Sequence, residues 1–162
     1  MDSFDLIVLG GGTGNIVASE AADAGLDVAL VEEGPLGGTC LNRGCNPSKQ
    51  LIHRADVVRT VCSASARGIE ATIDDIDFAS ITDEVNGMMA ETAARKESAA
   101  REHEHVTLYR RTGRFVDERT IEVTGDEDAA DSERITGDRV VLAGGSRPLV
   151  PDSIDGTDEV DY

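Results

Sequence analysis

The apolar positions near the start of the chain form two short continuous runs with a helical pattern between them. FDLIVL (residues 4–9) ends at the glycine-rich stretch GGGTGN, and LDVALVEE (residues 26–33) is a second run of the same kind. Short apolar runs bounded by glycine are typical of strands buried in a parallel sheet. Between them, IVASEAADAG has a helical composition, and Gly25 suits the C′ position that ends a helix. Residues 1–36 therefore predict a βαβ unit.

Two longer helices are predicted in the middle of the chain. Pro47 suits the first turn of a helix, where its missing N–H needs no partner, and helical periodicity continues over residues 48–66. A second helix is predicted from Asp77, as its N-cap, to about Glu104, because this stretch is rich in Ala, Glu and Arg.

The pattern changes to strands in the last third of the chain. Residues 106–125 alternate and carry β-branched side chains, which predicts two or three short antiparallel strands. A charged hairpin tip is expected at residues 126–133. RVVLAGG (residues 139–145) then predicts another buried strand, followed by an irregular exit segment. Together the elements predict an α/β fold with a parallel sheet and a small antiparallel β-meander.

Composition narrows the kind of core and the kinds of partner. The 162 residues suffice for one domain, and with 3% aromatic residues and no Trp the core must rely on Val, Ile, Leu and Ala. The formal net charge is −17, from 32 acidic and 15 basic residues, which disfavours nucleic acid and anionic membranes as partners. Because the carboxylates are spread along the chain, they are interpreted as a solubility device for a salt-rich cytoplasm.

No apolar run is long enough to span a bilayer, and the N-terminus lacks the basic region of a signal peptide. The sequence therefore predicts a soluble, cytoplasmic protein. Structural disulfides are disfavoured in that compartment, so a close cysteine pair indicates a redox or metal site.

The first candidate site is a dinucleotide-binding turn. Gly10, Gly12 and the position of Asn15 follow the G-x-G-x-x-G spacing after a strand, and Glu32 ends the second strand, where a carboxylate accepts hydrogen bonds from an adenosine ribose. A carboxylate there argues against the 2′-phosphate of NADP. The alternative is a glycine-rich turn without a ligand. Asn15 departs from the third glycine, which predicts that it points elsewhere or displaces the helix slightly.

The second candidate site is the thiol pair in GGTCLNRGCNPSK (residues 37–49). Cys45 immediately precedes a predicted helix, so the helix dipole and the cation of Arg43 both favour a reactive thiolate. Two alternatives stay open on spacing alone. One is a zinc site, with Cys40, Cys45, His53 and Cys62 as its ligands, and the other is a set of unpaired buried cysteines.

At these residues the chain resembles the FAD-dependent pyridine-nucleotide–disulfide oxidoreductases. GGTCLNRGCNPSK resembles their redox-cysteine signature, LIVLGGGTGN the FAD-phosphate loop and VALVEEGPLGGTC the ribose acid that leads to the redox pair. TGRF resembles the adenine-contact segment, and RVVLAGGSRPLVP the motif that closes the FAD domain. The resemblance covers the whole chain and implies a Rossmann-like FAD-binding domain.

The resemblance also implies residue roles. Cys40 would be the interchange thiol, Cys45 the charge-transfer thiol beside the flavin, and Lys49 would stabilise negative charge on the flavin ring. Further FAD contacts are implied for Gly10, Gly12, Gly14 and Asn15 in the phosphate loop, Glu32 and Glu33 near the ribose, Gly38 and Thr39 near the pyrophosphate, Gly113 at the adenine, and Ala143, Ser146 and Arg147 in the closing motif. No metal ligand is implied.

Some positions depart from the family pattern. A G-x-G-x-G-N version of the phosphate loop also occurs in the superfamily, which would accommodate Asn15. Arg43 and Asn46 replace residues that are usually apolar, and Gly144 stands where Thr is usual. Because Arg43 and Asn46 lie between or beside the thiols, our hypothesis is that they tune the redox potential or the choice of substrate.

The largest departure is length. Full-length relatives continue with an NAD(P) domain, the rest of the FAD domain and a C-terminal dimerisation domain that supplies a His–Glu acid–base pair. We therefore expect residues 1–162 to be the N-terminal part of the FAD domain. Its expected parts are an ADP-binding βαβ unit (1–36), the redox-cysteine segment with helices (37–105), the β-meander with the closing strand (106–147) and an exit segment (148–162). His53, His103 and His105 are predicted on solvated helix faces.

The resemblance implies a flavoprotein disulfide reductase similar to dihydrolipoamide dehydrogenase. Electrons would pass between NAD(P)H or NAD, FAD, the Cys40–Cys45 pair and a dithiol or disulfide substrate, either a small molecule or a lipoyl domain. A mercuric reductase or a low-molecular-weight thiol reductase is the alternative within the family, and an FAD-binding module without turnover is the alternative outside it. Full-length relatives imply a homodimer.

Overall fold

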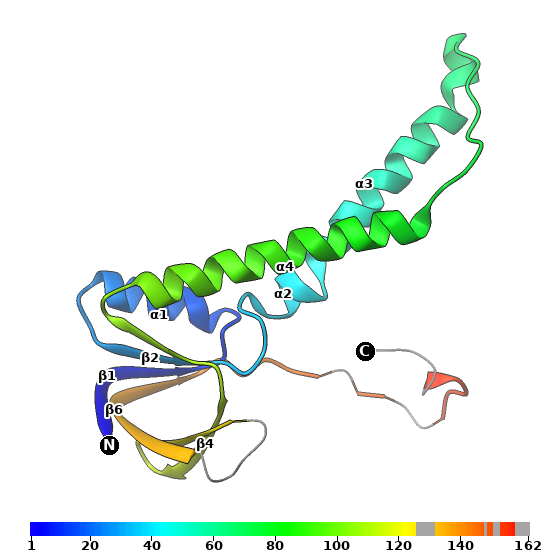
Figure 1. The fold of residues 1–162 in the computed structure, drawn as a ribbon. Helices are drawn as coiled ribbons and strands as arrows, with labels where there is room; N and C mark the ends of the chain where they lie inside the picture. Colours follow the sequence, from blue (N-terminus) through cyan, green and yellow to red (C-terminus); the bar gives the residue numbers. More distant parts are fainter. Residues whose placement is uncertain (126–131, 148, 151–152, 158–162) are drawn as a thin grey trace.

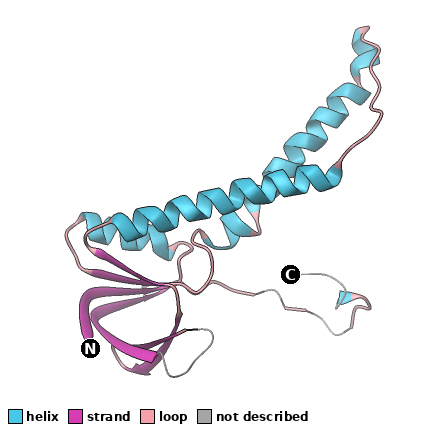
Figure 2. Cartoon of the chain, viewed as in Figure 1, coloured by secondary structure: helices cyan, strands magenta, loops and turns pink. Residues whose placement is uncertain are grey.

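Six strands form one mixed sheet in the computed structural model, which describes residues 1–125, 132–147, 149–150 and 153–157. The strands are β1 (Asp2–Leu9), β2 (Val28–Val31), β3 (Val106–Tyr109), β4 (Thr112–Asp117), β5 (Thr120–Thr124) and β6 (Ser132–Leu142). The helices are α1 (Gly14–Asp23), α2 (Gly38–Asn42), α3 (Cys45–Cys62) and α4 (Phe78–Glu102), with a 3₁₀ turn, η1, at Ala64–Arg67. This arrangement confirms the predicted α/β class (Figure 2).

The strand order is β3-β2-β1-β6-β5-β4, and β3, β2, β1 and β6 are mutually parallel. From β1 the chain proceeds outward to β2 and β3, and only later returns to the other side of β1 as β6. The carboxyl ends of β1 and β6 therefore lie at the point where the strand order reverses. In open α/β sheets, ligands bind at such a point, outside the carboxyl ends of the strands.

Strand β6 is longer than the sequence predicts, because it serves two parts of the sheet. Its first residues pair antiparallel with β5, from Ser132 to Thr136, and residues from Ile135 onward also pair parallel with β1. The predicted antiparallel meander is thus confirmed, but it continues the parallel sheet. Ser132 and Glu133 belong to β6, whereas the rest of the expected hairpin tip, residues 126–131, lies outside the described residues.

The alternation of β1 side chains divides the core into two layers. Leu6 and Val8 pack on the face covered by α1 and by the C-terminal end of α4, and Ile7 and Leu9 pack on the opposite face. On that opposite face the buried partners include Ile121 of β5. The buried hydrophobic residues are Leu, Ile, Val and Ala apart from Met89 and Tyr109, which agrees with the core expected from the composition.

The helix boundaries differ from the prediction mainly around the cysteines. The third helix begins at Cys45 instead of Ser48, and it is preceded by the short α2, which the sequence does not predict. The predicted N-cap of α4 is confirmed, because the Asp77 carboxylate accepts a hydrogen bond of 2.9 Å from the backbone N–H of Ser80. Gly25, with φ of +84°, follows α1 in the predicted C′ position.

Helix α3 and the first half of α4 extend away from the sheet as an arm (Figure 1). None of the α3 residues is buried, and large apolar side chains such as Ile52 and Val57 are exposed on it. The arm is joined to the rest by a small apolar cluster that includes Leu41 and Met89. Among the described residues, no helix combines the length and the hydropathy needed to span a bilayer.

The prediction for two of the histidines is wrong. His103 and His105 lie just beyond the end of α4, where each contacts an aspartate of the α1–β2 region. His103 Nε2 is 3.2 Å from Asp23 Oδ1, and His105 Nδ1 is 2.9 Å from Asp27 Oδ1. These contacts join the end of α4 to the turn before β2. Helical periodicity could not reveal them, since the partners are about 80 residues away in sequence.

His105 makes the stability of this region pH-dependent. The hydrogen bond to Asp27 raises the pKa of His105 above its ordinary value of 6.5, and the charge of Glu104 adds to the increase. A group whose pKa is raised in the folded state stabilises the fold. This stabilisation is fully present below the ordinary pKa and is lost as the pH rises through the raised pKa. We therefore expect His105→Gln to flatten the fall in the free energy of unfolding above about pH 6.5.

Urea denaturation at constant ionic strength, repeated across this pH window, measures that slope. His53→Gln is the matched control, because His53 is exposed on α3. A slope in His105→Gln equal to that of the wild type would contradict the assignment.

Candidate functional site

The turn after β1 is packed directly against the segment that follows β6. Gly10 has φ of +106°, and a Cβ placed on it would lie 2.2 Å from the carbonyl oxygen of Ala143. The backbone N–H of Ala143 in turn donates to the carbonyl of Leu9 at 2.7 Å. Only glycine satisfies both the positive φ and the close approach. The turn, residues 10–14, thus lies at the point where the strand order reverses, and we call it the phosphate loop.

The close packing of α1 on β1, expected at position 15, occurs at Gly14. Helix α1 begins at Gly14, which is buried, and a Cβ there would lie 2.8 Å from Val8 Cγ1 and 3.0 Å from Ala143 Cβ. The close approach of helix to strand, which the third glycine of the fingerprint permits, therefore occurs at Gly14. Asn15 does not displace the helix, and its half-buried side chain occupies the next helical position.

The cysteine segment begins in contact with the phosphate loop. A Cβ on Gly38, the first residue of α2, would lie 2.7 Å from Gly12 Cα, and Gly38 itself has φ of +62°. Beside this contact, the N–H of Gly37 donates to the carbonyl of Gly11 at 2.9 Å. The two backbones touch without any side chain between them, so the contact brings α2, with Thr39 and Cys40, to the phosphate loop.

Cys40 and Cys45 form a disulfide that links α2 to the first residue of α3. Their Cα atoms are 5.0 Å apart, and both residues are exposed. The alternative of unpaired buried cysteines is therefore wrong, and Cys62, although unpaired, is exposed as well. The zinc alternative is also unsupported, because no group of three or more metal-ligating side chains occurs in the described part of the chain.

Polar side chains lie close to the disulfide. Asn46 Oδ1 is 3.9 Å from the sulfur of Cys40 and 3.9 Å from that of Cys45. Lys49 is exposed one helical turn after Cys45. Arg43 is also exposed, and it lines a groove of about 410 Å³ between α4 and the segment before α3. The Asn46 amide therefore lies beside the sulfurs, and Arg43 and Lys49 are exposed near Cys45 in the sequence.

Glu32 lies immediately after β2, beside the phosphate loop. Its Oε2 accepts a hydrogen bond of 2.7 Å from the N–H of Gly11, and its Oε1 accepts one of 2.8 Å from the N–H of Gly34. Two backbone donors therefore fix the orientation of the carboxylate. The side chain is half-buried, which leaves part of it accessible to a ligand at the edge of the sheet.

Glu33 and Gly113 lie where β4 approaches the end of β2. The hydroxyl of Thr112 donates to Glu33 Oε2 at 2.6 Å. A Cβ on Gly113 would lie 2.8 Å from Leu9 Cδ2 and 3.1 Å from Val31 Cγ1, so this glycine lets β4 pack closely over the ends of β1 and β2. Burial raises the pKa of Tyr109, at the end of β3, to about 12, so its hydroxyl stays protonated at neutral pH.

The residues of the closing motif are only partly brought to the site. Ala143 contacts the phosphate loop, as described above, whereas Ser146 and Arg147 are exposed on the extended segment that leaves the sheet after β6 (Figure 1). Neither has a described contact with the loop or with the disulfide.

Comparison with known proteins identifies the family. The family model described as "Pyridine nucleotide-disulphide oxidoreductase" matches residues 4–162. The chain belongs to this family.

The relatives that the chain matches have names that indicate different activities. The chain is 36% identical over 158 residues to mycothione reductase of Mycobacterium tuberculosis, which covers 95% of the chain and 33% of the relative. It is 37% identical over 146 residues to dihydrolipoyl dehydrogenase 2 of Haloarcula marismortui (90% and 30%) and 32% identical over 160 residues to mercuric reductase of Staphylococcus aureus (98% and 28%). The chain thus spans about a third of the length of these curated relatives.

The first prediction for this oxidoreductase site concerns the contact between Gly10 and Ala143. Gly10→Ala must both adopt a positive φ and displace the Ala143 carbonyl, so we expect it to lower the free energy of unfolding by about 3 kcal/mol or more. Gly25→Ala is the matched control, because Gly25 has φ of +84° with no atom within 4 Å of an added Cβ. It should cost only about 1 kcal/mol. Equal losses in urea denaturation would show that the close approach does not matter.

Proposed function

We propose that the chain is the FAD-binding part of a flavoprotein disulfide reductase whose redox centre is the Cys40–Cys45 disulfide. The observation that carries the proposal is the backbone contact between Gly12 and Gly38. It joins a dinucleotide-type glycine turn to the short helix that bears Cys40. A nucleotide bound at the turn would therefore extend toward the sulfurs.

The described residues fit an FAD molecule at this edge of the sheet. No side chain caps the N-terminus of α1, so its backbone N–H groups would be available to a pyrophosphate. Glu32 offers carboxylate oxygens to the ribose hydroxyls, and Gly38 and Thr39 lie on the pyrophosphate side. Glu33 would lie near the ribose and Gly113 at the adenine. Ala143 would border the loop, whereas Ser146 and Arg147 would have to approach from the exposed exit segment.

The cysteines would act by thiol–disulfide exchange. Bound FAD would supply two-electron redox chemistry beside the disulfide. The thiolate of a dithiol substrate would attack Cys40 Sγ, form a mixed disulfide and release Cys45 as a thiolate. The second substrate thiolate would then displace Cys40, leaving an oxidised substrate and a reduced cysteine pair that holds two electrons. The N-terminus of α3 stabilises the Cys45 thiolate, and Lys49 would stabilise negative charge near it.

The substrate and the second cofactor follow from the same comparison. We propose a dithiol or disulfide substrate, such as a lipoyl group, with mercuric ion and a low-molecular-weight disulfide as the alternatives that the relatives' names suggest. By analogy with full-length relatives, NAD(P) would bind outside residues 1–162, and a homodimer is expected for a full-length enzyme.

The proposal is tested by thiol titration and flavin binding. The chain has three cysteines and one disulfide, so one thiol should react before treatment with excess dithiothreitol and three afterwards. FAD should bind and give a yellow complex. Reduction of the pair should then change the visible absorption of the flavin in the wild type but not in Cys45→Ser, because only the wild type places a thiolate beside the ring.

Cys62→Ser is the control, since Cys62 lies at the far end of α3. It should show the same change in flavin absorption as the wild type, with no reactive thiol before reduction and two afterwards. A chain that binds no FAD, or one whose flavin spectrum ignores the state of the pair, would contradict the proposal. Reduction of the flavin by NADH is not expected in the isolated chain, because NAD(P) would bind outside residues 1–162.

Asn46 provides a separate prediction about the redox potential. Its amide oxygen can accept from a cysteine S–H, and its amide N–H₂ can donate to a thiolate, so either orientation stabilises the reduced pair over the disulfide. One such hydrogen bond corresponds to about 10–30 mV. We expect Asn46→Val to lower the reduction potential of the pair by that amount, measured in dithiothreitol redox buffers.

Arg43→Val should also lower the potential, because it removes a cation that stabilises the thiolate. His53→Gln, two turns along α3, should leave the potential unchanged. An Asn46→Val potential equal to that of the wild type would show that this amide has no tuning role.

A further inference from the structure

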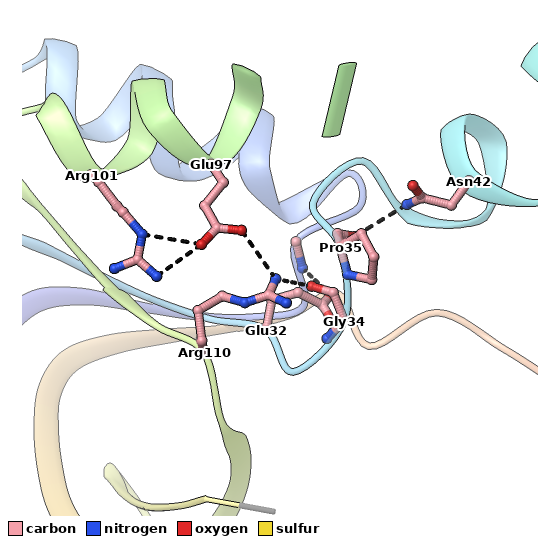
Figure 3. A network of polar contacts seen from close by, with 8 residues as sticks. Glu32, Gly34, Pro35, Asn42, Glu97, Arg101 and Arg110 are labelled. Carbon is pink, nitrogen blue, oxygen red and sulfur yellow. Dashed lines mark hydrogen bonds and ion pairs between the residues drawn. The ribbon is translucent and has the colours of Figure 1, made fainter. Parts of the chain in front are cut away.

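The side chain of Glu32 is connected to α4 by a continuous chain of polar contacts (Figure 3). It begins at Glu32, whose Oε1 accepts from the N–H of Gly34 at 2.8 Å. The carbonyl of the same glycine accepts a hydrogen bond from Arg110 Nη1. Arg110 Nη1 also lies 3.7 Å from Glu97 Oε2, and Arg101 Nη2 donates to Glu97 Oε1 at 2.8 Å.

Arg110 is the member of this chain of contacts that joins the turn after β2 to α4 with one side chain. It directly follows β3, and it meets the turn after β2 on one side and α4 on the other. The side chains of Arg110 and Glu97 are only 29% and 30% exposed, so the ion pair is partly shielded from solvent. A partly buried guanidinium with an anionic partner keeps a defined direction toward the Gly34 carbonyl.

Gly34 transmits that direction to the carboxylate. Its carbonyl is held by Arg110 and its N–H is held by Glu32, so both polar groups of one flexible residue are occupied. Without Arg110, the turn after β2 would gain freedom at a glycine, and the Oε1 contact of Glu32 would loosen with it. The Oε2 contact with Gly11 alone would leave the carboxylate free to rotate.

We propose that Arg110 is a positioning residue that sets the Glu32 carboxylate for the hydroxyl groups of an adenosine ribose. This inference rests on the proposed function, in which the ADP part of FAD binds at the phosphate loop. Arg110 would contribute to ribose selectivity indirectly, because it contacts Gly34 and Gly34 contacts Glu32. Loss of Arg110 should therefore weaken the hydrogen bonds between Glu32 and the ribose hydroxyls more than the binding of the pyrophosphate.

Calorimetric titration with ADP and 2′-deoxy-ADP separates these two effects. A cation near an anionic ligand favours both nucleotides equally, so the ratio of their dissociation constants reports only the 2′-hydroxyl contact. In the wild type, one hydrogen bond to a charged group should make this ratio about ten-fold or more. Glu32→Gln should reduce the ratio to about three-fold or less.

Arg110→Gln should lower the ratio toward that of Glu32→Gln, although it leaves the carboxylate in place. Arg110→Lys, which keeps a cationic donor for the Gly34 carbonyl, should restore part of the ratio. Arg114→Gln is the matched control, because it removes an arginine that pairs with Glu122 on the adjacent strand. It should leave the ratio at the wild-type value.

Each failure has its own signature. If the wild type and Arg110→Gln have the same ratio while Glu32→Gln loses it, the proposed function stands and the role of Arg110 is refuted. If the wild type binds neither nucleotide, the proposed function fails, and the role of Arg110 fails with it. Should Arg110→Gln not fold, as judged by circular dichroism, a ratio in Arg110→Lys equal to that of the wild type, together with an unchanged ratio in Glu97→Gln, would refute the role.

Discussion

The arrangement of the site depends on one backbone contact, in which the turns at Gly12 and Gly38 approach without side chains between them. A Cβ on Gly38 would lie 2.7 Å from Gly12 Cα, so any other residue at this position would force the two segments apart. Because α2 starts at Gly38 and α3 follows the disulfide, the positions of both helices derive from this contact. The glycine turn after β1 and the disulfide therefore form one unit.

The chain carries many more acidic than basic side chains, and specific contacts orient some of its carboxylates. With a net charge of −17, the described carboxylates repel one another wherever nothing orients them. Arginines resolve this at defined places: Arg110 and Arg101 hold Glu97, and Arg114 holds Glu122 and lowers its pKa. At Glu32 the carboxylate is oriented instead by two backbone N–H groups, which carry no net charge.

The sequence predicts those features of the fold whose cause is local. The βαβ unit follows from two apolar runs and a glycine turn, and the start of α4 follows from Asp77, because capping acts within three residues. Helix α2 could not be predicted, since five residues contain too little periodicity. Arg110 was also missed, because its partner Gly34 is 76 residues away and a backbone carbonyl leaves no mark on the sequence pattern.

The division between backbone and side-chain contacts explains which departures from the family pattern the fold tolerates. The phosphate loop is formed by backbone atoms and glycines, so the shift of the close approach from position 15 to Gly14 requires only that α1 begin there. Arg43 and Asn46, by contrast, are exposed, and Asn46 lies beside the disulfide. Substitution there changes the chemistry around the sulfurs without disturbing the contact at Gly12. Residues that determine differences in activity among relatives are therefore expected on the exposed side of α2 and α3.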